Sequence, residues 1–265
     1  MPDTTPAPQL LRVEGLQKSY GDFEALRNIS FSAKQGELVC IVGPSGCGKT
    51  TLLKCIAGLL APTSGTVELD GVPVTSPPKK MAVVFQEYGR SLMPWMTVRR
   101  NVELPLLRGT DKAERDRRVD EALDAVGLGA AGNKFPWQLS GGMQQRVAIA
   151  RAIAYGPEVL IMDEPFAAVD AQTRADLEDL VRDIWKRFGV TVLFVTHDID
   201  ESVYLGERVV VLSMSPTYVQ EDLTIDLPVE RDQIATRALP RFTELRTHVY
   251  EQIQRAKRGA STPAA

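Results

Sequence analysis

A glycine-rich segment near the start of the chain, Gly43–Thr50, constrains the fold more than any other feature of the sequence. It reads GPSGCGKT and fits the pattern G-x-x-x-x-G-K-[ST] in full. A nearly continuous apolar run over residues 36–42 precedes it, and a helical pattern from Thr50 to Leu60 follows. Glycines let successive backbone N–H groups turn inward around an anion, and the helix N-terminus adds partial positive charge. The alternative, a glycine-rich turn with a chance lysine, requires neither flanking element. The sequence therefore predicts a strand, a phosphate-binding loop and a helix in succession.

The side chains of this loop also suit a nucleotide phosphate. Lys49 is expected to neutralise the β- and γ-phosphates, and the Thr50 hydroxyl is expected to ligate Mg²⁺. The residues expected to hold the nucleotide here are Gly43, Pro44, Ser45, Gly46, Cys47, Gly48, Lys49, Thr50 and Thr51.

Further strand patterns predict the sheets around this loop. Residues 159–162 and 190–195 are apolar runs bounded by helical patterns, and strands that alternate with helices form βαβ units with a parallel sheet. Residues 10–20 and 23–33 instead alternate apolar and polar side chains, as antiparallel strands with one exposed face do. The expected fold is α/β, with a parallel-sheet core and an antiparallel edge sheet.

The middle of the chain is expected to be helical. Apolar residues recur at three- and four-residue spacing over residues 97–107, 111–126 and 140–154. These segments predict a helical subdomain over about residues 87–156. The main domain is expected to span residues 10–240, flanked by the following segments: a disordered tail over 1–9, an amphipathic helix over 241–258 and a frayed end over 259–265.

Composition excludes several classes of protein. The formal net charge is −3, so the chain is not basic enough for a dedicated nucleic-acid binder, and no nucleic-acid partner is expected. The longest apolar runs fall far short of the roughly 18 residues that a membrane span needs. Three cysteines, Cys40, Cys47 and Cys55, cannot all pair, so a disulfide framework is not expected. The composition favours a soluble intracellular α/β protein.

Two acidic residues end the apolar run at 159–162. Carboxylates at the carboxyl end of a parallel strand point into the crevice where open α/β sheets bind ligands. Asp163 is expected to hold Mg²⁺ through its water shell, and Glu164 to polarise an attacking water.

Leu139–Arg146, which reads LSGGMQQR, stands between the loop and the acidic pair and resembles the signature of the ATP-binding-cassette (ABC) ATPases. The motifs agree with that family in order and spacing from about Leu10 to Leu212. The resemblance implies ATP hydrolysis with Mg²⁺. Further residues that match the family's motifs are Tyr20, Gln86, Asp170 and His197.

The resemblance also assigns roles to these residues. Tyr20 corresponds to the aromatic residue that stacks on adenine. Gln86 is implied to contact Mg²⁺ and sense the water, and His197 to contact the γ-phosphate. Asp170 is implied to couple two sites across a dimer interface. These assignments make Lys49, Gln86, Glu164 and His197 the expected catalytic residues.

The signature implies a homodimer. Its Ser140 is a natural N-cap, and Gly141 and Gly142 leave backbone amides bare at a helix start. In the family, the signature of one subunit completes the ATP site of the other, so that two chains sandwich two ATP molecules. This chain has one copy of each motif and is therefore expected to work as a homodimer.

The segment from Phe85 to Trp95 resembles the cassettes of bacterial importers for nitrate, aliphatic sulfonates and taurine. The family docks its permease on an apolar cluster here, and the alternative is a subdomain core. We expect Trp95 to contact the partner. The cluster comprises Tyr88, Leu92, Met93, Pro94 and Trp95.

The resemblance thus implies the ATP-hydrolysing subunit of an importer for a small anionic solute. It is expected on the cytoplasmic face of the inner membrane, with a separate permease and an extracytoplasmic solute-binding protein. The alternatives are a soluble ABC ATPase that acts as an assembly factor, and an importer of a different small organic solute. Two segments depart from the subfamily, Ser213–Gln220 and the pair Ala167-Ala168, and both loosen the substrate assignment.

Cys47 lies beside Lys49 and near a helix N-terminus, a setting that favours the thiolate. We therefore expect alkylation of Cys47 to block nucleotide binding, and ATP to protect it. Cys40 and Cys55 lie in apolar patterns and are expected to be packing residues. His248 is expected to be a surface residue of the closing helix.

Overall fold

The structure is a computed structural model that describes residues 9–86, 88–167 and 169–259. The chain forms two compact units. Unit 1 comprises residues 1–78 and 190–265, and unit 2 comprises residues 79–189. The predicted tails fall almost wholly outside the described residues, but Gln9 already belongs to the first strand and Gly259 to the last helix.

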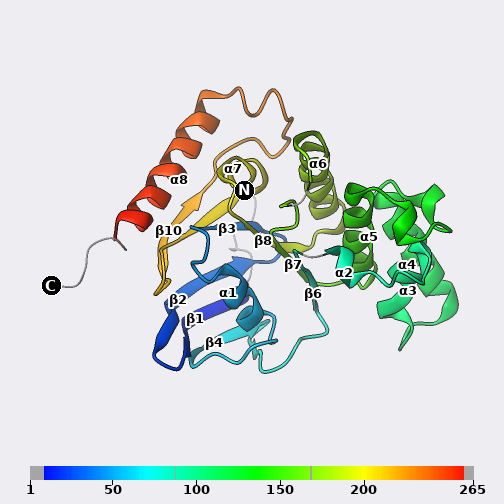
Figure 1. Cartoon of the computed structure of the whole chain (residues 1–265), viewed down its shortest axis with the longest axis horizontal. Coiled ribbons are helices and arrows are strands. Elements are labelled where there is room, and N and C mark those ends of the chain that lie inside the picture. The colour runs from blue at the N-terminus through cyan, green and yellow to red at the C-terminus, as the bar shows by residue number, and fades with distance from the viewer. Residues whose placement is uncertain (1–8, 87, 168, 260–265) are drawn as a thin grey trace, which may run out of the picture. The chain divides into compact units, whose positions relative to one another are not determined.

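The alternating patterns near the N-terminus form the antiparallel sheet of unit 1, as predicted. Its strand order is β2-β1-β4-β5, and β1, β2 and β4 lie side by side (Figure 1). The buried apolar residues of the first two strands run from Leu10 to Ala33. The bounds are β1 Gln9–Tyr20, β2 Phe23–Lys34, β4 Ser64–Leu69 and β5 Val72–Pro73.

The buried strand before the phosphate loop lies inside a second set of strands of unit 1, ordered β10-β9-β3-β8. Every residue of β3 and β8 is buried, which explains their continuous apolar sequences. The β3 strand runs parallel to both β8 and β9. The bounds are β3 Leu38–Val42, β8 Thr191–Thr196, β9 Arg208–Leu212 and β10 Val219–Thr224.

The helices of unit 1 are α1 Lys49–Ile56, α7 Ile199–Leu205 and α8 Pro240–Gly259. The pattern predicted α1 as far as Leu60, but the helix ends earlier because Gly58 has a positive φ of 68°. The stripe on α8 that includes Phe242 and Val249 is buried, and α8 lies alongside β10 in Figure 1.

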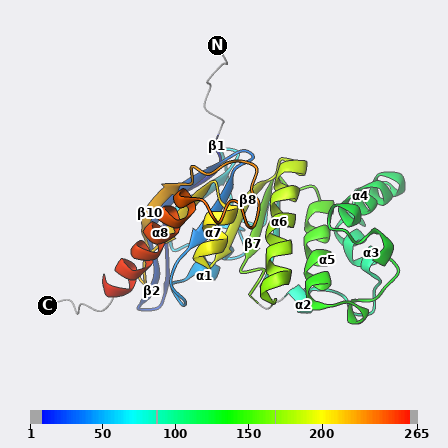
Figure 2. The same cartoon turned by 90° about the horizontal axis from the view of Figure 1, so that it is seen from above.

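Unit 2 contains the parallel pair β6 Met81–Val84 and β7 Val159–Asp163 together with the helical subdomain. In Figure 2, α5 lies between α6 on one side and α3 with α4 on the other. The helices are α2 Tyr88–Ser91, α3 Val98–Glu103, α4 Lys112–Ala125, α5 Gly141–Ala154 and α6 Ala171–Phe188, with 3-10 turns at Leu104–Leu106, Gly129–Ala131 and Pro136–Gln138. The predicted helix over 97–107 thus ends in a 3-10 turn, because Pro105 has no N–H for an α-helical bond.

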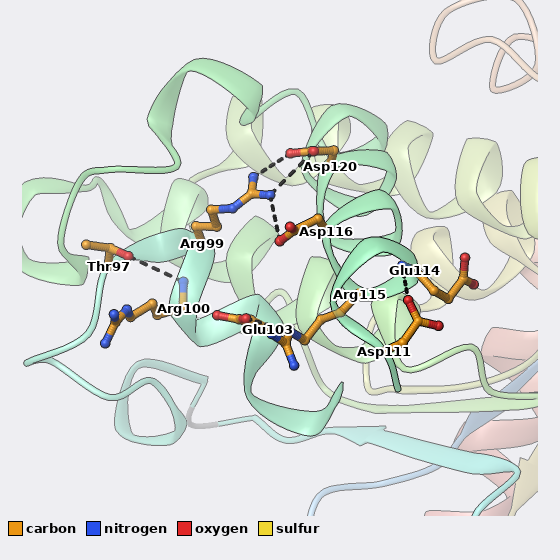
Figure 3. A network of polar contacts seen from close by, with 9 residues as sticks. All are labelled: Thr97, Arg99, Arg100, Glu103, Asp111, Glu114, Arg115, Asp116 and Asp120. Carbon is orange, nitrogen blue, oxygen red and sulfur yellow. Dashed lines mark hydrogen bonds and ion pairs between the residues drawn. The ribbon is translucent and has the colours of Figure 1, made fainter. Parts of the chain in front are cut away.

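Ion pairs and caps fix α3 against α4 (Figure 3). Arg99 of α3 contacts both Asp116, at 3.5 Å, and Asp120 of α4. The Nε of Arg115 lies 2.7 Å from Oε1 of Glu103. Side chains cap both helices, since Thr97 accepts from Arg100 N and Asp111 from Glu114 N. The charged segment at the start of α4 is therefore a helix face whose charges are paired.

None of the described helices is long and apolar enough to cross a membrane.

Candidate functional site

The phosphate loop leaves β3 and runs directly into α1. Gly46 and Gly48 have positive φ values of 78° and 95°, which L side chains rarely adopt. A Cβ on Gly48 would lie 3.2 Å from Cδ2 of Leu26, so the loop passes close to β2. Ser45 and Thr50 are exposed on the loop, and their hydroxyls are accessible to a ligand.

Lys49 is the first residue of α1, and its side chain is buried. Its ammonium donates to the carbonyl oxygens of Gly43, at 3.1 Å, and Pro44, at 3.2 Å. These bonds hold the charge over the loop rather than in solvent. The structure therefore brings together a buried cation, glycines with positive φ and a helix N-terminus.

His197 lies at the same sheet edge as the phosphate loop. The parallel register pairs Val42, the last residue of β3, with Thr196, the last residue of β8. Gly43 and His197 therefore leave neighbouring strands at equivalent positions, and His197 is exposed there. This placement fits the predicted contact with a γ-phosphate.

A buried network that sequence reasoning missed holds the turn after β8. Thr196 Oγ1 donates to Oε2 of the buried Glu201 at 2.5 Å and accepts from the amide of Asp198 at 2.9 Å. The Asp198 side chain caps α7 by accepting from Glu201 N at 3.1 Å. An aspartate followed three residues later by a glutamate before an apolar run is a capping-box signal, and it was available in the sequence.

Tyr20 ends β1 at the tight turn into β2, where it pairs with Phe23. The residue is 49% exposed, so part of its ring is accessible for stacking on a base. The ammonium of Lys18 lies 5.3 Å from the ring centroid, a cation–π distance. The fold thus places the predicted adenine-stacking residue in unit 1, together with the phosphate loop and His197.

Gln86, Asp163 and Glu164 belong to unit 2, where the register of β6 and β7 brings them to one edge. Val84, the last residue of β6, pairs with Met162 of β7, so both strands end side by side. Gln86 is exposed, Asp163 is buried at the strand end and Glu164 is half-buried. An amide and two carboxyl groups therefore follow strand ends at the same edge of unit 2, and their joint role stays a prediction.

Glu164 has a strained backbone. Its φ is +43°, in the left-handed region that residues other than glycine and asparagine rarely occupy. Such strain costs about 1–3 kcal/mol and persists where a site requires one particular side-chain direction. The strain is an independent observation that singles out Glu164 from the other acidic residues that the structure describes in unit 2.

Two helix N-termini of unit 2 carry the other predicted residues. Ser140 caps α5 by accepting from Met143 N at 3.3 Å. Asp170 caps α6 by accepting from the amide and the hydroxyl of Thr173, at 3.0 and 2.7 Å. These bonds from Thr173 lower the pKa of the Asp170 carboxyl. Gly141 is exposed at the α5 N-terminus, beside Ser140.

Gly142 packs against the start of α6. A Cβ on this residue would lie 2.5 Å from Cγ2 of Thr173, which no real contact allows. A larger residue at this position would therefore force the Thr173 side chain to move. Gln144, missed by sequence reasoning, fixes the preceding turn by donating to the carbonyls of Pro136 and Leu139 at 3.1 and 3.3 Å.

The apolar cluster after Gln86 divides between core and surface. Leu92 is buried, whereas Trp95 is 70% exposed. The side chain of Asn101, fully buried, organises the loop between them: it accepts from Met93 N at 2.7 Å and donates to the carbonyls of Met93, Met96 and Thr97 at 3.1–3.2 Å. Leu92 therefore fits the subdomain core, whereas Trp95 is exposed, and docking of a permease on the cluster stays a prediction. The side chain of Tyr88 and the residues Glu87 and Ala168 lie outside the described part.

The reactivity predicted for Cys47 does not fit its burial. Cys47 has no exposed surface, and its sulfur packs towards Gly43. Cys40 and Cys55 are also buried, as predicted, and burial raises the pKa of the Cys55 thiol. The electropositive neighbours were visible in the sequence, but the inward direction of the side chain was not. His248 lies on α8, partly exposed, with Nε2 2.8 Å from Oε1 of Glu221.

Comparison with known proteins identifies the family of this chain. A family model described as ABC transporter matches residues 26–167. The nitrate import ATP-binding protein NrtD of Synechocystis sp. is 50% identical over 213 residues, which are 80% of this chain and 79% of that protein. The chain belongs to the ABC transporter family. The ABC resemblance drawn from the motifs is therefore confirmed.

Two further ABC proteins support the fold and the activity. The taurine import ATP-binding protein TauB of Roseobacter denitrificans is 43% identical over 234 residues, which are 87% of each chain. A dimeric ATP-binding cassette in a post-hydrolysis state, bound to ADP and Pi, matches with a TM-score of 0.70 and 36% identity, covering 81% of this chain and 98% of that one. The chain is thus an ABC ATPase with the predicted α/β fold, while the roles of single residues stay predictions.

Proposed function

We propose that this chain is the ATP-hydrolysing subunit of a bacterial importer for a small anionic solute of the nitrate, sulfonate or taurine type. It acts as a homodimer on the cytoplasmic face of the inner membrane and drives a separate permease. An extracytoplasmic solute-binding protein delivers the solute. The names of the relatives at 43–50% identity support the importer class.

The observation that carries the transport assignment is the exposed indole of Trp95 on a preorganised loop. A tryptophan that is 70% exposed buries a large apolar area when a partner covers it. Because Asn101 already holds the loop in place, docking costs little conformational entropy. A rigid loop with an exposed aromatic anchor fits a protein partner, and the permease of the importer is the partner proposed here.

The nucleotide is proposed to bind through the phosphate loop. The backbone amides of the loop hold the phosphates, Lys49 neutralises their charge, and Tyr20 stacks on the base. Thr50 and Gln86 are proposed to supply direct oxygen ligands to Mg²⁺, and Asp163 is proposed to hold the ion through its water shell, because Mg²⁺ keeps several waters and takes only one or two ligands from protein beside the phosphates. When bound, Mg²⁺ neutralises charge on the β- and γ-phosphates.

Hydrolysis is proposed to depend on Glu164. The strained backbone fixes its carboxylate, which orients and polarises the attacking water. Gln86, at the same edge of unit 2, orients the same water, and His197 stabilises the γ-phosphate through a hydrogen bond. In the dimer, the capped α5 N-terminus at Ser140–Gly142 contacts the ATP held by the other subunit, and Asp170 couples the two sites.

A pull-down from detergent-solubilised native membranes tests the transport assignment. The wild-type chain is expected to capture a multi-span membrane protein, identified by mass spectrometry. Trp95→Ala should lose that protein and retain ATPase activity. Trp137→Ala is the matched control, because this side chain is also 70% exposed in unit 2, stacked on Phe135 at 5.9 Å.

The outcomes separate the candidate functions. Capture of only water-soluble partners by the wild-type chain would favour an assembly factor and overturn the importer. Equal loss of the permease in both tryptophan variants would refute the role of Trp95 and leave the importer assignment standing. Once the permease is known, uptake of labelled nitrate, taurine and another small organic solute by the reconstituted complex determines the cargo.

A further inference from the structure

The segment Ser213–Tyr218, which departs from the subfamily pattern, connects β9 to β10 and packs against two parts of unit 1. Its backbone joins the edge of β2: the amide of Thr217 donates to Ala25 O at 3.1 Å, and the amide of Arg27 donates to Thr217 O at 2.7 Å. A parallel bridge pairs Thr217 with Leu26 between those two bonds. The segment is thereby attached to the strand that follows Tyr20.

The ends of the segment are also tied to each other. The amide of Ser213 donates to Tyr218 O at 3.0 Å, and the Ser213 hydroxyl accepts from the amide of Tyr218 at 2.9 Å. The Ser215 hydroxyl donates to Glu24 O at 3.2 Å. Because both its ends and its middle are fixed, the segment is a rigid support rather than a free loop.

The side chain of Thr217 reaches from this support to the phosphate loop. Its hydroxyl donates to the carbonyl oxygen of Cys47, and Thr217 is fully buried. A Cβ on Gly48 would lie 3.8 Å from the Thr217 hydroxyl oxygen, so Thr217 lies close to the next residue of the loop as well. A loop that turns its N–H groups inward turns carbonyls outward, and a buried carbonyl needs a donor.

We infer that Thr217 is a positioning residue for ATP binding, because its hydroxyl fixes the Cys47 peptide of the phosphate loop relative to β2. This hydrogen bond links the phosphate loop to the segment attached to β2, the strand that follows the turn bearing Tyr20. The inference rests on the proposed nucleotide site and deepens it, since Thr217 itself is placed behind the loop and acts through Cys47.

Isothermal titration of MgATP into the full-length chain tests this role. Thr217→Val keeps the shape of the side chain but removes the hydroxyl that donates to the Cys47 carbonyl. We expect the dissociation constant to rise about five- to tenfold, the equivalent of one net hydrogen bond. Thr217→Ser retains the hydroxyl and should bind MgATP within about twofold of the wild type.

Thr236→Val is the matched control for a purely structural effect. Thr236 is another buried threonine of unit 1, and its hydroxyl accepts from Asp232 N at 2.9 Å, away from the loop. The Thr236→Val variant should lower the unfolding midpoint as Thr217→Val does, but its affinity for MgATP should not change. An equal loss of affinity in both valine variants would overturn the inference.

The test also separates this inference from the proposed site. If the wild-type chain binds MgATP no better than Lys49→Ala, the proposed phosphate loop fails. If the wild type binds and Thr217→Val binds equally well, only the role of Thr217 fails. Should Thr217→Val not fold, Thr217→Cys replaces the hydroxyl by a weak donor, and wild-type affinity in that variant would overturn the inference.

Discussion

Replacing Asn101 by alanine should release the loop that presents Trp95. The side-chain amide makes one bond as acceptor and reaches three carbonyl oxygens as donor. Since the amide has two N–H groups, these contacts amount to three full hydrogen bonds, each with a net value of about 1 kcal/mol. We expect Asn101→Ala to lower the free energy of unfolding of unit 2 by about 3 kcal/mol.

Hydrogen exchange at the Met93 amide is the direct assay, because that amide donates to Asn101 and loses its acceptor in the variant. If the substitution lowers the free energy of local opening of the loop by about 3 kcal/mol, the protection factor of this amide should fall by about two orders of magnitude. Urea unfolding measures the global effect. Asn133→Ala removes an exposed asparagine of the same unit and should change stability by less than about 0.5 kcal/mol.

Asn101→Asp refines the test. A carboxylate keeps the acceptor for Met93 N but offers no donor to the three carbonyls, so it should destabilise the loop at least as much as alanine at pH 7. A cost below about 1 kcal/mol for Asn101→Ala, with unchanged exchange at Met93, would refute the reasoning that this side chain organises the loop.

Three further predictions concern the site and its surroundings. Glu164→Gln should retain ATP binding, slow hydrolysis at least about 100-fold and accumulate an ATP-bound dimer in size-exclusion chromatography; undiminished turnover would contradict the role of Glu164. Hydrogen bonds from Arg117 and Arg118 lower the pKa of Glu114 from 4.5 to about 2, so its stabilising contribution is complete above about pH 4.5 and is lost as the pH falls towards 2. Glu114→Gln should therefore flatten the acid limb of the stability curve in this range, measured by urea titrations, and superimposable curves would argue against the ion pairs. Because Cys47 is buried, its alkylation should be slow in the folded chain, faster in urea and slowed further by ATP; equal rates with and without ATP would show that its labelling is independent of the loop.

The sequence predicted those parts of the site that depend on local order. The strand before the phosphate loop, the helix that follows it and the cap by Ser140 each follow from residues a few positions apart. Periodicity also located the strand that ends in Asp163, because a strand buried on both faces leaves a continuous apolar run.

What could not be predicted depends on contacts between distant segments. Thr217 and Cys47 lie 170 residues apart, and nothing in either neighbourhood indicates their hydrogen bond. The burial of Cys47 was missed for the same reason, since packing against Gly43 sets the direction of the side chain. The early end of α3 is different, because Pro105 was visible and indicates the break by itself.

The cap at the start of α7 has a consequence for the kinetics of nucleotide binding. Because Thr196, Asp198 and Glu201 already hold the turn, the backbone around His197 needs no ordering when a nucleotide arrives. Rotation of one exposed side chain takes picoseconds to nanoseconds, whereas the ordering of a loop extends to microseconds. NMR relaxation dispersion at the Asp198 amide should therefore be flat with and without ATP, and any slow step in binding should originate elsewhere in the molecule.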